Sequence, residues 1–396
     1  MLFAKLNDLS IGGKGSYGIA ASAVERKADL PTYLRITDIF DDGTLNLSEL
    51  KSVDAPNSDK YILKPNDIVF ARTGGSTGRN YFYDGSDGVF VYAGFLIKFS
   101  IDPEKVNPKY VKYYCRSKQY NDWVQSFNTG STRGNINAQI FGNMEIPLPE
   151  RKQQDYLVSI LEPIDEKIRN NKQVNDNLEQ QAQAIYHERF ETASPDDLHS
   201  GWRTVTLGEV ATILNKSFNP LKEPEMLLEH YSIPAFDEAR FPVFDLSTSI
   251  KSNKFIIDAS CFMISKLNPT TKRVWKPYCL TGNAVCSTEF IVYKAKDKTI
   301  TDFLYSVIDS NSFSDFMCSH VTGSTGSRQR TTPSDTLSYE LILPSEDDLA
   351  EFQSLVSPMY AQIRINAIEN DRLKRLRDSL LPKLMSGEIN VSAVQF

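Results

Sequence analysis

The stretch Leu157–Ile185, LVSILEPIDEKIRNNKQVNDNLEQQAQAI, decides the architecture of this chain of 396 residues. Its apolar and asparagine residues are spaced alternately four and three apart, which is the heptad repeat of a helix that packs along another helix. A second stretch, Phe352–Leu380, FQSLVSPMYAQIRINAIENDRLKRLRDSL, repeats this spacing 195 residues later. We therefore expect two long helices that pair with each other. The residues expected to pair are Ile164, Ile168, Asn171, Asn175, Leu178, Ile185, Met359, Ile363, Asn366, Asn370, Leu373 and Leu380.

Asparagines stand at two heptad positions of each helix. A buried asparagine lowers stability but fixes the register and the number of partners. A helix packed only on its own globular domain does not need one, although two such surface helices remain the alternative. Pro163 and Pro358 occupy matching positions, and they predict a kink or a restart in each helix.

The rest of the chain is also duplicated, in two copies of about 195 residues. Thr129–Thr132 recurs as Thr322–Thr325, and the strand-like segment 61–71 is matched by 255–264. Each copy has short aromatic and β-branched strands, such as 89–92, 94–99 and 290–293, and then a short helix, at 108–123 and 301–316. The sequence predicts an α+β fold of two repeats related by a pseudo-twofold axis, with the long helices antiparallel. The expected segments are a first globular domain (1–150), the first helix and linker (151–200), a second globular domain (201–344), and the second helix and tail (345–396).

The composition excludes several classes of protein. Apolar residues make up 41% and charged residues 24% of the chain, as in an ordinary folded protein. No apolar run is long enough to span a membrane, and Met1–Asn7 lacks the features of a secretory signal. The five cysteines form no C-x-x-C pair, so we expect a cytoplasmic protein without a disulfide framework. The formal net charge is −6, and its acidic excess lies in the two helical segments.

The usual motifs of catalysis are absent from the sequence. There is no G-x-G-x-x-G, P-loop, G-x-S-x-G or H-E-x-x-H, and the four histidines are scattered. Neither an Asn-Pro-Pro-aromatic motif nor a nuclease carboxylate cluster occurs. We therefore expect a protein that is not an enzyme, with no catalytic residue and no metal ligand.

Two loops in each copy combine glycine, hydroxyl and basic residues. Glycine lets backbone amides approach phosphates, hydroxyls donate to phosphate oxygens, and arginine or asparagine can read base edges. The alternative is a set of plain polar loops, but four of them at paired positions favour DNA binding. The candidate DNA-contacting residues of the first copy are Arg72, Thr73, Gly74, Ser76, Thr77, Arg79, Gly130, Ser131, Thr132, Arg133 and Asn135. Those of the second copy are Lys266, Asn268, Thr271, Lys272, Arg273, Gly323, Ser324, Thr325, Arg328, Gln329 and Arg330.

Four segments resemble the specificity subunit of a Type I restriction–modification system. They are MEIPLP (144–149) with Gln153-Gln154, LKRLRDSLLPKLMSGEI (373–389), DIVFARTG (67–74) and the segment 202–210. The second copy departs from the family's Arg-Thr-Gly form at Phe262–Lys266, and the globular domains are the variable part of the family.

This resemblance implies a non-catalytic subunit. Each globular domain would be a target recognition domain that reads one half of a two-part site in double-stranded DNA, with a spacer of fixed length between the halves. The helices would dock two modification (methyltransferase) subunits, and restriction (motor and nuclease) subunits would join them. S-adenosylmethionine, ATP and magnesium would belong to those partners. A non-catalytic scaffold that binds only proteins remains the alternative function.

Overall fold

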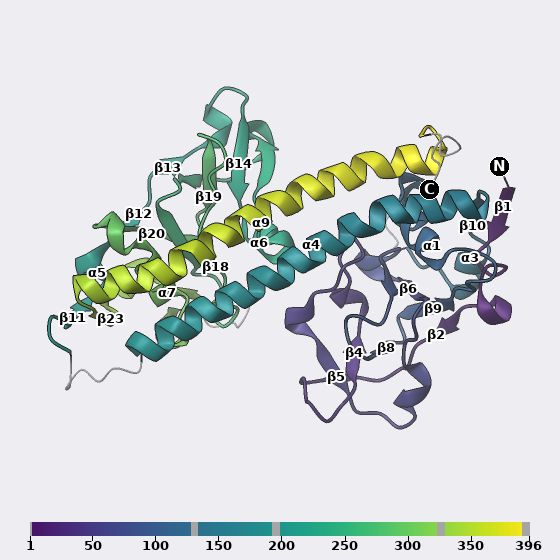
Figure 1. Cartoon of the computed structure of the whole chain (residues 1–396), viewed down its shortest axis with the longest axis horizontal. Coiled ribbons are helices and arrows are strands. Elements are labelled where there is room, and N and C mark those ends of the chain that lie inside the picture. The colour runs from purple at the N-terminus through teal and green to yellow at the C-terminus, as the bar shows by residue number, and fades with distance from the viewer. Residues whose placement is uncertain (1, 128–133, 192–198, 323–328, 390–396) are drawn as a thin grey trace. The chain divides into compact units, whose positions relative to one another are not determined.

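The chain forms two compact units, which we describe separately. The computed structural model describes residues 2–127, 134–191, 199–322 and 329–389. Unit 1 comprises residues 1–166 and 373–396, and unit 2 comprises residues 167–372. Each unit therefore holds one globular part and one stretch of each long helix (Figure 1). The domain limits expected at residues 150, 200 and 344 stay predictions, because the units divide the two helices between them.

Unit 1 contains two four-stranded sheets and a two-stranded one. The sheet β2-β9-β6-β7 is antiparallel throughout, whereas the sheet β3-β5-β4-β8 includes the parallel pair β4–β8. Strand β1 pairs with β10. The strands are β1 (Leu2–Lys5), β2 (Ser16–Tyr17), β3 (Ala23–Val24), β4 (Thr32–Leu34), β5 (Lys51–Val53), β6 (Asp67–Ala71), β7 (Asn80–Tyr83), β8 (Phe90–Tyr92), β9 (Leu96–Ser100) and β10 (Glu145–Leu148). The short helices are α1 (Pro108–Tyr114), α2 (Lys118–Gln125) and α3 (Ala138–Gly142).

Unit 2 repeats this plan. The sheet β12-β20-β17-β18 is antiparallel, and the sheet β13-β16-β19-β14-β15 includes the parallel pair β14–β19. The strands are β11 (Arg203–Thr206), β12 (Ala211–Leu214), β13 (Ser217–Phe218), β14 (Leu227–Tyr231), β15 (Val243–Leu246), β16 (Lys254–Ile256), β17 (Cys261–Ser265), β18 (Val274–Trp275), β19 (Ala284–Ser287), β20 (Phe290–Ala295), β21 (Val321–Thr322), β22 (Arg330–Thr331) and β23 (Glu340–Leu343). The short helices are α5 (Leu207–Val210), α6 (Ile233–Ala239), α7 (Thr301–Ile308) and α8 (Asn311–Ser319). Since β11 pairs with β23 as β1 pairs with β10, the expected internal repeat is confirmed.

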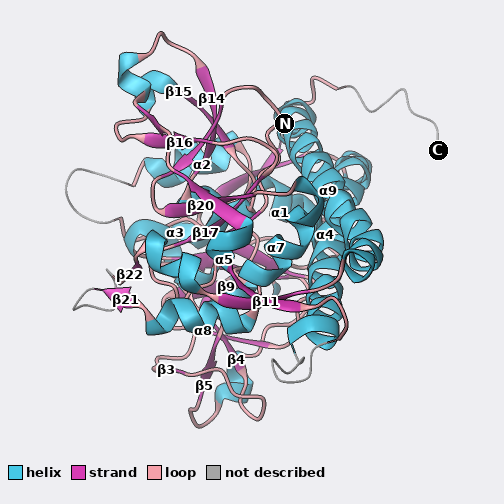
Figure 2. Cartoon of the chain, turned by 90° about the vertical axis from the view of Figure 1, so that its left-hand side faces the viewer, coloured by secondary structure: helices cyan, strands magenta, loops and turns pink. Residues whose placement is uncertain are grey.

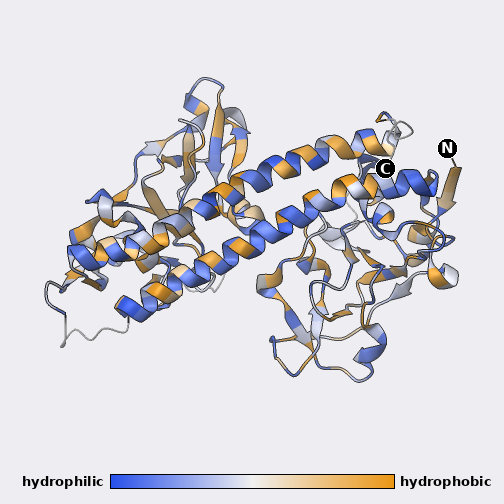
Figure 3. Cartoon of the chain, in the orientation of Figure 1, coloured by the Kyte–Doolittle hydropathy of each residue, from blue (hydrophilic) through white to orange (hydrophobic). Residues whose placement is uncertain are grey.

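The two long helices are α4 (Arg151–Tyr186), which a π-helical turn extends to Glu191, and α9 (Glu346–Ser386). In both views a stretch of α4 lies beside a stretch of α9 (Figures 1 and 2). Hydrophilic and hydrophobic segments alternate along both helices, as the heptad pattern requires (Figure 3). The apolar stripes are buried within the cores of the units: Leu157 and Leu161 join Leu381 and Leu384 in unit 1. In unit 2, Ala182 and Tyr186 join Phe352 and Val356.

The asparagines of the heptad pattern meet across the helix pair inside unit 2. The Asn171 amide donates to the Asn370 side-chain oxygen at 2.9 Å, and the Asn366 amide donates to that of Asn175 at 2.8 Å. Asn171, Asn366 and Asn370 are buried. Because the residue numbers rise along α4 as they fall along α9, the helices are antiparallel. The predicted α+β fold with an antiparallel helix pair is confirmed.

Three expectations about helices need correction. Helix α4 runs without a break through Pro163, so the predicted restart is wrong there. The buried heptad residues Leu161 and Ile168, on either side of it, hold the helix together although proline removes one backbone donor. The helices expected at 108–123 and 301–316 are each two helices. Ser117 caps α2 by accepting from the Tyr120 amide, and Ser310 caps α8 in the same way, so each serine begins a new helix.

Candidate nucleic-acid interface

In unit 1 the loop after β6 begins with Arg72, whose guanidinium lies against two aromatic rings. Its central carbon is 5.3 Å from the centre of the Tyr17 ring and 5.7 Å from that of Phe95. Both rings are exposed, by 44% and 55%. The Arg72 Nε is buried and has no hydrogen-bond partner among the described residues. A buried unpaired donor of this kind calls for an acceptor from outside, such as a ligand oxygen or a water molecule.

The structure brings the two predicted loops of the first copy together as far as they are described. The Thr77 hydroxyl donates to the backbone oxygens of Gly74, at 2.8 Å, and of Gly134, at 2.9 Å. Thr73 and Asn135 form an isolated β-bridge. Gly74–Ser76 forms a single 3-10 turn. Gly130, Ser131, Thr132 and Arg133 lie outside the described residues.

The second copy joins its loops in the same manner. The Asn268 amide donates to the Gln329 backbone oxygen at 2.9 Å, and Leu267 forms a β-bridge with Arg330. A turn follows, in which the Thr271 amide donates to the backbone oxygen of Asn268. The structure thus places the described part of each loop pair side by side. Gly323, Ser324, Thr325 and Arg328 lie outside the described residues.

Carboxylates from distant segments pair with four of the predicted cations. Lys272 lies 3.0 Å from Asp309, and the Arg330 side chain contacts both carboxylate oxygens of Glu289, at 2.9 and 3.1 Å. The other two pairs join Arg79 with Asp41, at 2.6 Å, and Arg273 with Asp237, at 2.5 Å. These contacts neutralise part of the positive charge of the loops. Sequence reasoning missed the carboxylates because they are distant in the chain and no local pattern marks them.

The arginine–aspartate pairs occupy the same place in the two copies. The Ala71 amide donates to the Arg79 backbone oxygen at 2.8 Å, and the Ser265 amide donates to that of Arg273 at 2.9 Å. Each donor is the last residue of the corresponding strand, β6 or β17. Both copies have an arginine–aspartate pair at this place. We therefore assign the pair to the structure that the two copies share.

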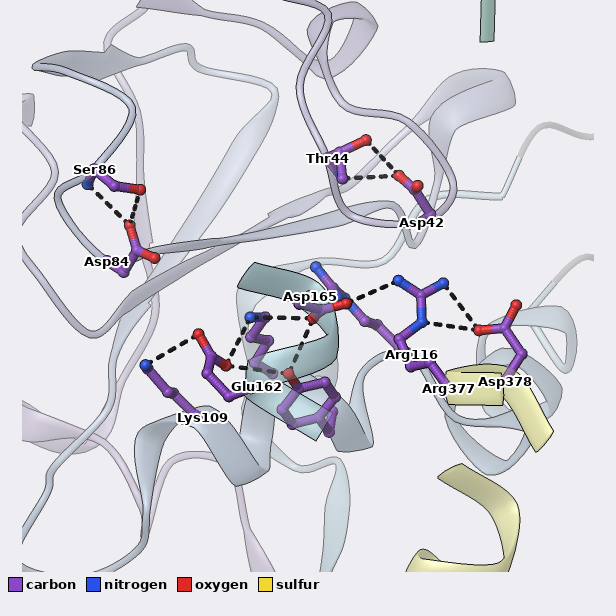
Figure 4. A network of polar contacts seen from close by, with 12 residues as sticks. Asp42, Thr44, Asp84, Ser86, Lys109, Arg116, Glu162, Asp165, Arg377 and Asp378 are labelled. Atoms are coloured by element: carbon purple, nitrogen blue, oxygen red, sulfur yellow. Dashed lines mark hydrogen bonds and ion pairs between the residues drawn. The ribbon is translucent and has the colours of Figure 1, made fainter. Parts of the chain in front are cut away.

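A cluster of charged residues in unit 1 ties the globular part to both long helices (Figure 4). Asp165 of α4 lies 2.9 Å from Arg116, 3.4 Å from Lys112 and 2.9 Å from Arg377 of α9. The Tyr113 hydroxyl donates to the same carboxylate at 2.9 Å. One turn before it, Glu162 pairs with Lys112 at 3.1 Å and with Lys109 at 3.0 Å.

The neighbouring cations decide the charge of this cluster. Burial opposes ionisation of Asp165, but Arg116, Lys112 and Arg377 outweigh it and hold the pKa of the carboxyl well below its usual range. Burial lowers the pKa of the Lys112 ammonium, and nearby Arg116 lowers it further, although Asp165 and Glu162 oppose the change. Asp165 is therefore ionised, and we assign the cluster to holding the domain on its helices.

Two other kinds of site are absent from the described residues. No group of three or more His, Cys, Asp or Glu there could hold a metal ion. Within the same part of the chain, every helix is too short or too polar to pass through a lipid bilayer.

This chain is similar in sequence and in fold to proteins of known class. Residues 26–180 match the family model described as "Type I restriction modification DNA specificity domain". The MjaIX specificity subunit of Methanocaldococcus jannaschii is 23% identical over 74% of this chain and 71% of its own length. The HindI specificity subunit of Haemophilus influenzae is 22% identical over 94% of this chain and 98% of its own. The crystal structure of the S subunit from M. genitalium shares the fold, with a TM-score of 0.55 and 16% identity over 97% of this chain and 95% of that one.

The chain is thus a repeated α+β domain on an antiparallel helix pair, and its first copy carries the match to a DNA specificity domain. Residues 26–180 carry the match to a Type I restriction–modification DNA specificity domain, and the chain is similar over most of its length to Type I specificity subunits. The roles of the individual loop and helix residues stay predictions.

Proposed function

We propose that this chain reads a two-part DNA target, one half with each globular domain, and that the helix pair sets the distance between the halves. The observation that carries the proposal is the duplicated loop framework. Each copy joins the loop after β6 or β17 to a second loop, and each rests on its own stretch of α4 and α9. Two such frameworks in one chain fit two short recognised sequences with an unread spacer between them.

The proposal also assigns the chemistry to other subunits. The chain docks two modification subunits and, through them, the restriction subunits, and it acts in the cytoplasm as a non-catalytic part of the complex. S-adenosylmethionine, ATP and magnesium are bound by those partners. The partial neutralisation of the loops supports weak binding by the chain alone, because carboxylates pair with four of its eight candidate cations.

The spacer function can be tested by lengthening both helices together. One heptad is inserted between Asn175 and Leu178, and one between Ile363 and Asn366. These sites lie opposite each other, because the Asn175 amide reaches the Ile363 backbone oxygen at 3.4 Å. The insertions keep the heptad phase and both asparagine pairs. Seven residues add about 10 Å of helix, which corresponds to roughly three base pairs.

The readout is methylation, in cells with the modification subunit, of sites that have the same halves and graded spacers. We expect the variant to prefer a longer spacer, with weaker methylation because the added base pairs also rotate one half around the duplex. A matched control inserts one heptad in α4 alone, which shifts the pairing of the two helices by seven residues on one side of the insertion and should abolish methylation. An active double-insertion variant that keeps the original spacer would show that the helices do not set the distance.

The alternative function is a scaffold that binds only proteins. The salt dependence of DNA binding distinguishes it from the proposed DNA-reading function. A complex of the chain with its modification subunit should lose affinity steeply as salt rises, because each neutralised phosphate releases counterions. Failure to bind duplex DNA at low salt would favour the scaffold.

A further inference from the structure

Three backbone segments meet around Arg72 in unit 1. The Arg72 amide donates to the backbone oxygen of Phe95 at 3.1 Å, and its own backbone oxygen accepts from the Ile136 amide at 2.9 Å. Asn135, directly before Ile136, forms the β-bridge with Thr73. The side chains of Phe95 and Asn135, which flank the arginine on its two sides, are exposed.

The same three segments meet around Lys266 in unit 2. The Lys266 amide donates to the backbone oxygen of Glu289 at 2.9 Å, and its backbone oxygen accepts from the Thr331 amide at 3.1 Å. Arg330, directly before Thr331, forms the β-bridge with Leu267. By this pattern of hydrogen bonds, Glu289 occupies the place of Phe95 and Arg330 occupies the place of Asn135.

The side chains at these two places differ in chemistry, although the backbone around them is the same. The first copy offers an exposed apolar ring and an amide. The second offers a carboxylate and a guanidinium, which contact each other through two hydrogen bonds. This contrasts with the arginine–aspartate pair, which is the same in both copies. The two copies share a backbone framework and differ in the side chains at two places. This is the arrangement that two domains need if they are to read different DNA sequences.

We infer that these two places read one base pair in each half of the target, an A·T pair by Asn135 with Phe95 and a G·C pair by Arg330 with Glu289. Asparagine can bond adenine through two hydrogen bonds, and an apolar side chain contacts the thymine methyl group. Arginine can bond guanine in a fork, and a carboxylate accepts from the cytosine amino group. The inference rests on the proposed function and names the base pairs that it would read.

The ion pair in unit 2 does not prevent this reading. The side chains of Arg330 and Glu289 are 43% and 28% exposed, so DNA can reach both. An ion pair this open to solvent is a weak interaction, because water screens it and both side chains lose freedom in forming it. In the complex the guanidinium would exchange a carboxylate for the guanine edge, while the carboxylate turns to the cytosine amino group.

The test exchanges the two sets of side chains and maps the methylated motif. Glu289→Phe combined with Arg330→Asn gives unit 2 the chemistry of unit 1, and Phe95→Glu combined with Asn135→Arg does the reverse. Each variant is expressed with the modification subunit, and methylated sites are found by long-read sequencing. We expect the first variant to change one base pair of one half from G·C to A·T, with a preference of about tenfold or more. The reverse variant should make the opposite change in the other half.

The control changes a matched ion pair on the helices of unit 2. Arg189 and Glu351 lie 2.9 Å apart, so Glu351→Phe with Arg189→Asn makes the same exchange of residue types away from the loops. This variant should keep the wild-type motif. Thermal unfolding of every variant shows whether the fold is kept. If an exchange variant is unfolded, Glu289→Gln and Arg330→Gln replace it, and each should relax the preference at that one base pair.

The possible outcomes separate the inference from the proposed function. A wild-type complex that methylates no two-part motif overturns both. If the wild type has such a motif and the folded exchange variants keep it unchanged, the two-part function stands and the base-pair inference is wrong. Loss of methylation at every sequence by a folded variant also overturns the inference, because the ion pair would then serve the domain or the phosphate backbone.

Discussion

Asp165 of α4 pairs with cations of the first domain and of α9. Asp165→Asn therefore tests how strongly these ion pairs hold the domain on the helices. The substitution keeps the shape of the side chain and removes its charge. It leaves Arg116, Lys112 and Arg377 without the carboxylate that they share. The side chain of Asp165 is only 13% exposed, so water replaces little of the lost attraction.

The size of the effect follows from the contacts. Separations of 2.9, 2.9 and 3.4 Å each correspond to an attraction of about 5–6 kcal/mol at an effective dielectric constant of about 20. Desolvation of the carboxylate opposes them, and removal of one partner from a buried ion pair costs about 3–5 kcal/mol in practice. Since the asparagine oxygen can still accept one hydrogen bond, we expect about 3 kcal/mol, or a fall in Tm of roughly 6–12 °C for a unit of this size.

Thermal unfolding of the full chain, followed at several pH values, provides the measurement. The pKa of Asp165 is lowered by folding, so its stabilising effect is present above the unfolded pKa of about 3.9 and is lost as the pH falls below it. The difference between wild type and variant should therefore be full at pH 7 and shrink below about pH 4. Asp122→Asn is the control, since the side chains of its pair with Lys118 are 81% and 63% exposed and the change should shift Tm by less than 2 °C. A shift for Asp165→Asn as small as that of the control would refute the reasoning.

Two further predictions concern unit 2. Asn370→Ala leaves the buried Asn171 amide without one of its acceptors, so the free energy of unfolding should fall by about 1–3 kcal/mol; denaturant unfolding measures it, and an unchanged midpoint would mean that water replaces the lost contact. Burial lowers the pKa of His230 although Asp245 opposes the change, so the unfolded chain binds more protons near pH 6 and stability should decline as the pH falls through about 6.5. His230→Gln should weaken that decline in thermal scans between pH 7.5 and 5.5, and an identical pH profile for the variant would contradict the assignment.

The sequence predicted the long helices best, because a heptad pattern is local and repeats many times. Every heptad position supports the same prediction, so the evidence for a paired helix grows along Leu157–Ile185 and Phe352–Leu380. The antiparallel direction also followed, since two repeats related by a pseudo-twofold axis place their helices in opposite directions. The continuity of α4 at Pro163 did not follow, because the neighbouring buried residues outweigh the local preference of proline.

The loops of the candidate interface could be predicted from the sequence, but the side chains that surround them could not. Glycine, hydroxyl and basic residues mark the loops in the sequence. The repeat shows that the loops of the two copies correspond. Their surroundings depend on contacts between distant segments: Glu289 lies 41 residues from Arg330, and Tyr17 lies far from Arg72 in the chain. Such contacts leave no local periodicity. The structure was needed to show that several of the cations already have acidic partners.

The duplicated framework also explains how recognition and stability can be separated in this chain. The two domains keep the same backbone hydrogen bonds around Arg72 and Lys266, and those bonds do not depend on which side chains flank them. The flanking positions are exposed or half-buried, so a change there removes little buried apolar area and should cost little stability. The burial that holds the fold lies elsewhere, in the sheet cores and along the helix pair. Under the proposed base-pair reading, substitutions at Phe95, Asn135 or their counterparts would therefore alter the target sequence while the domain stays folded on its helices.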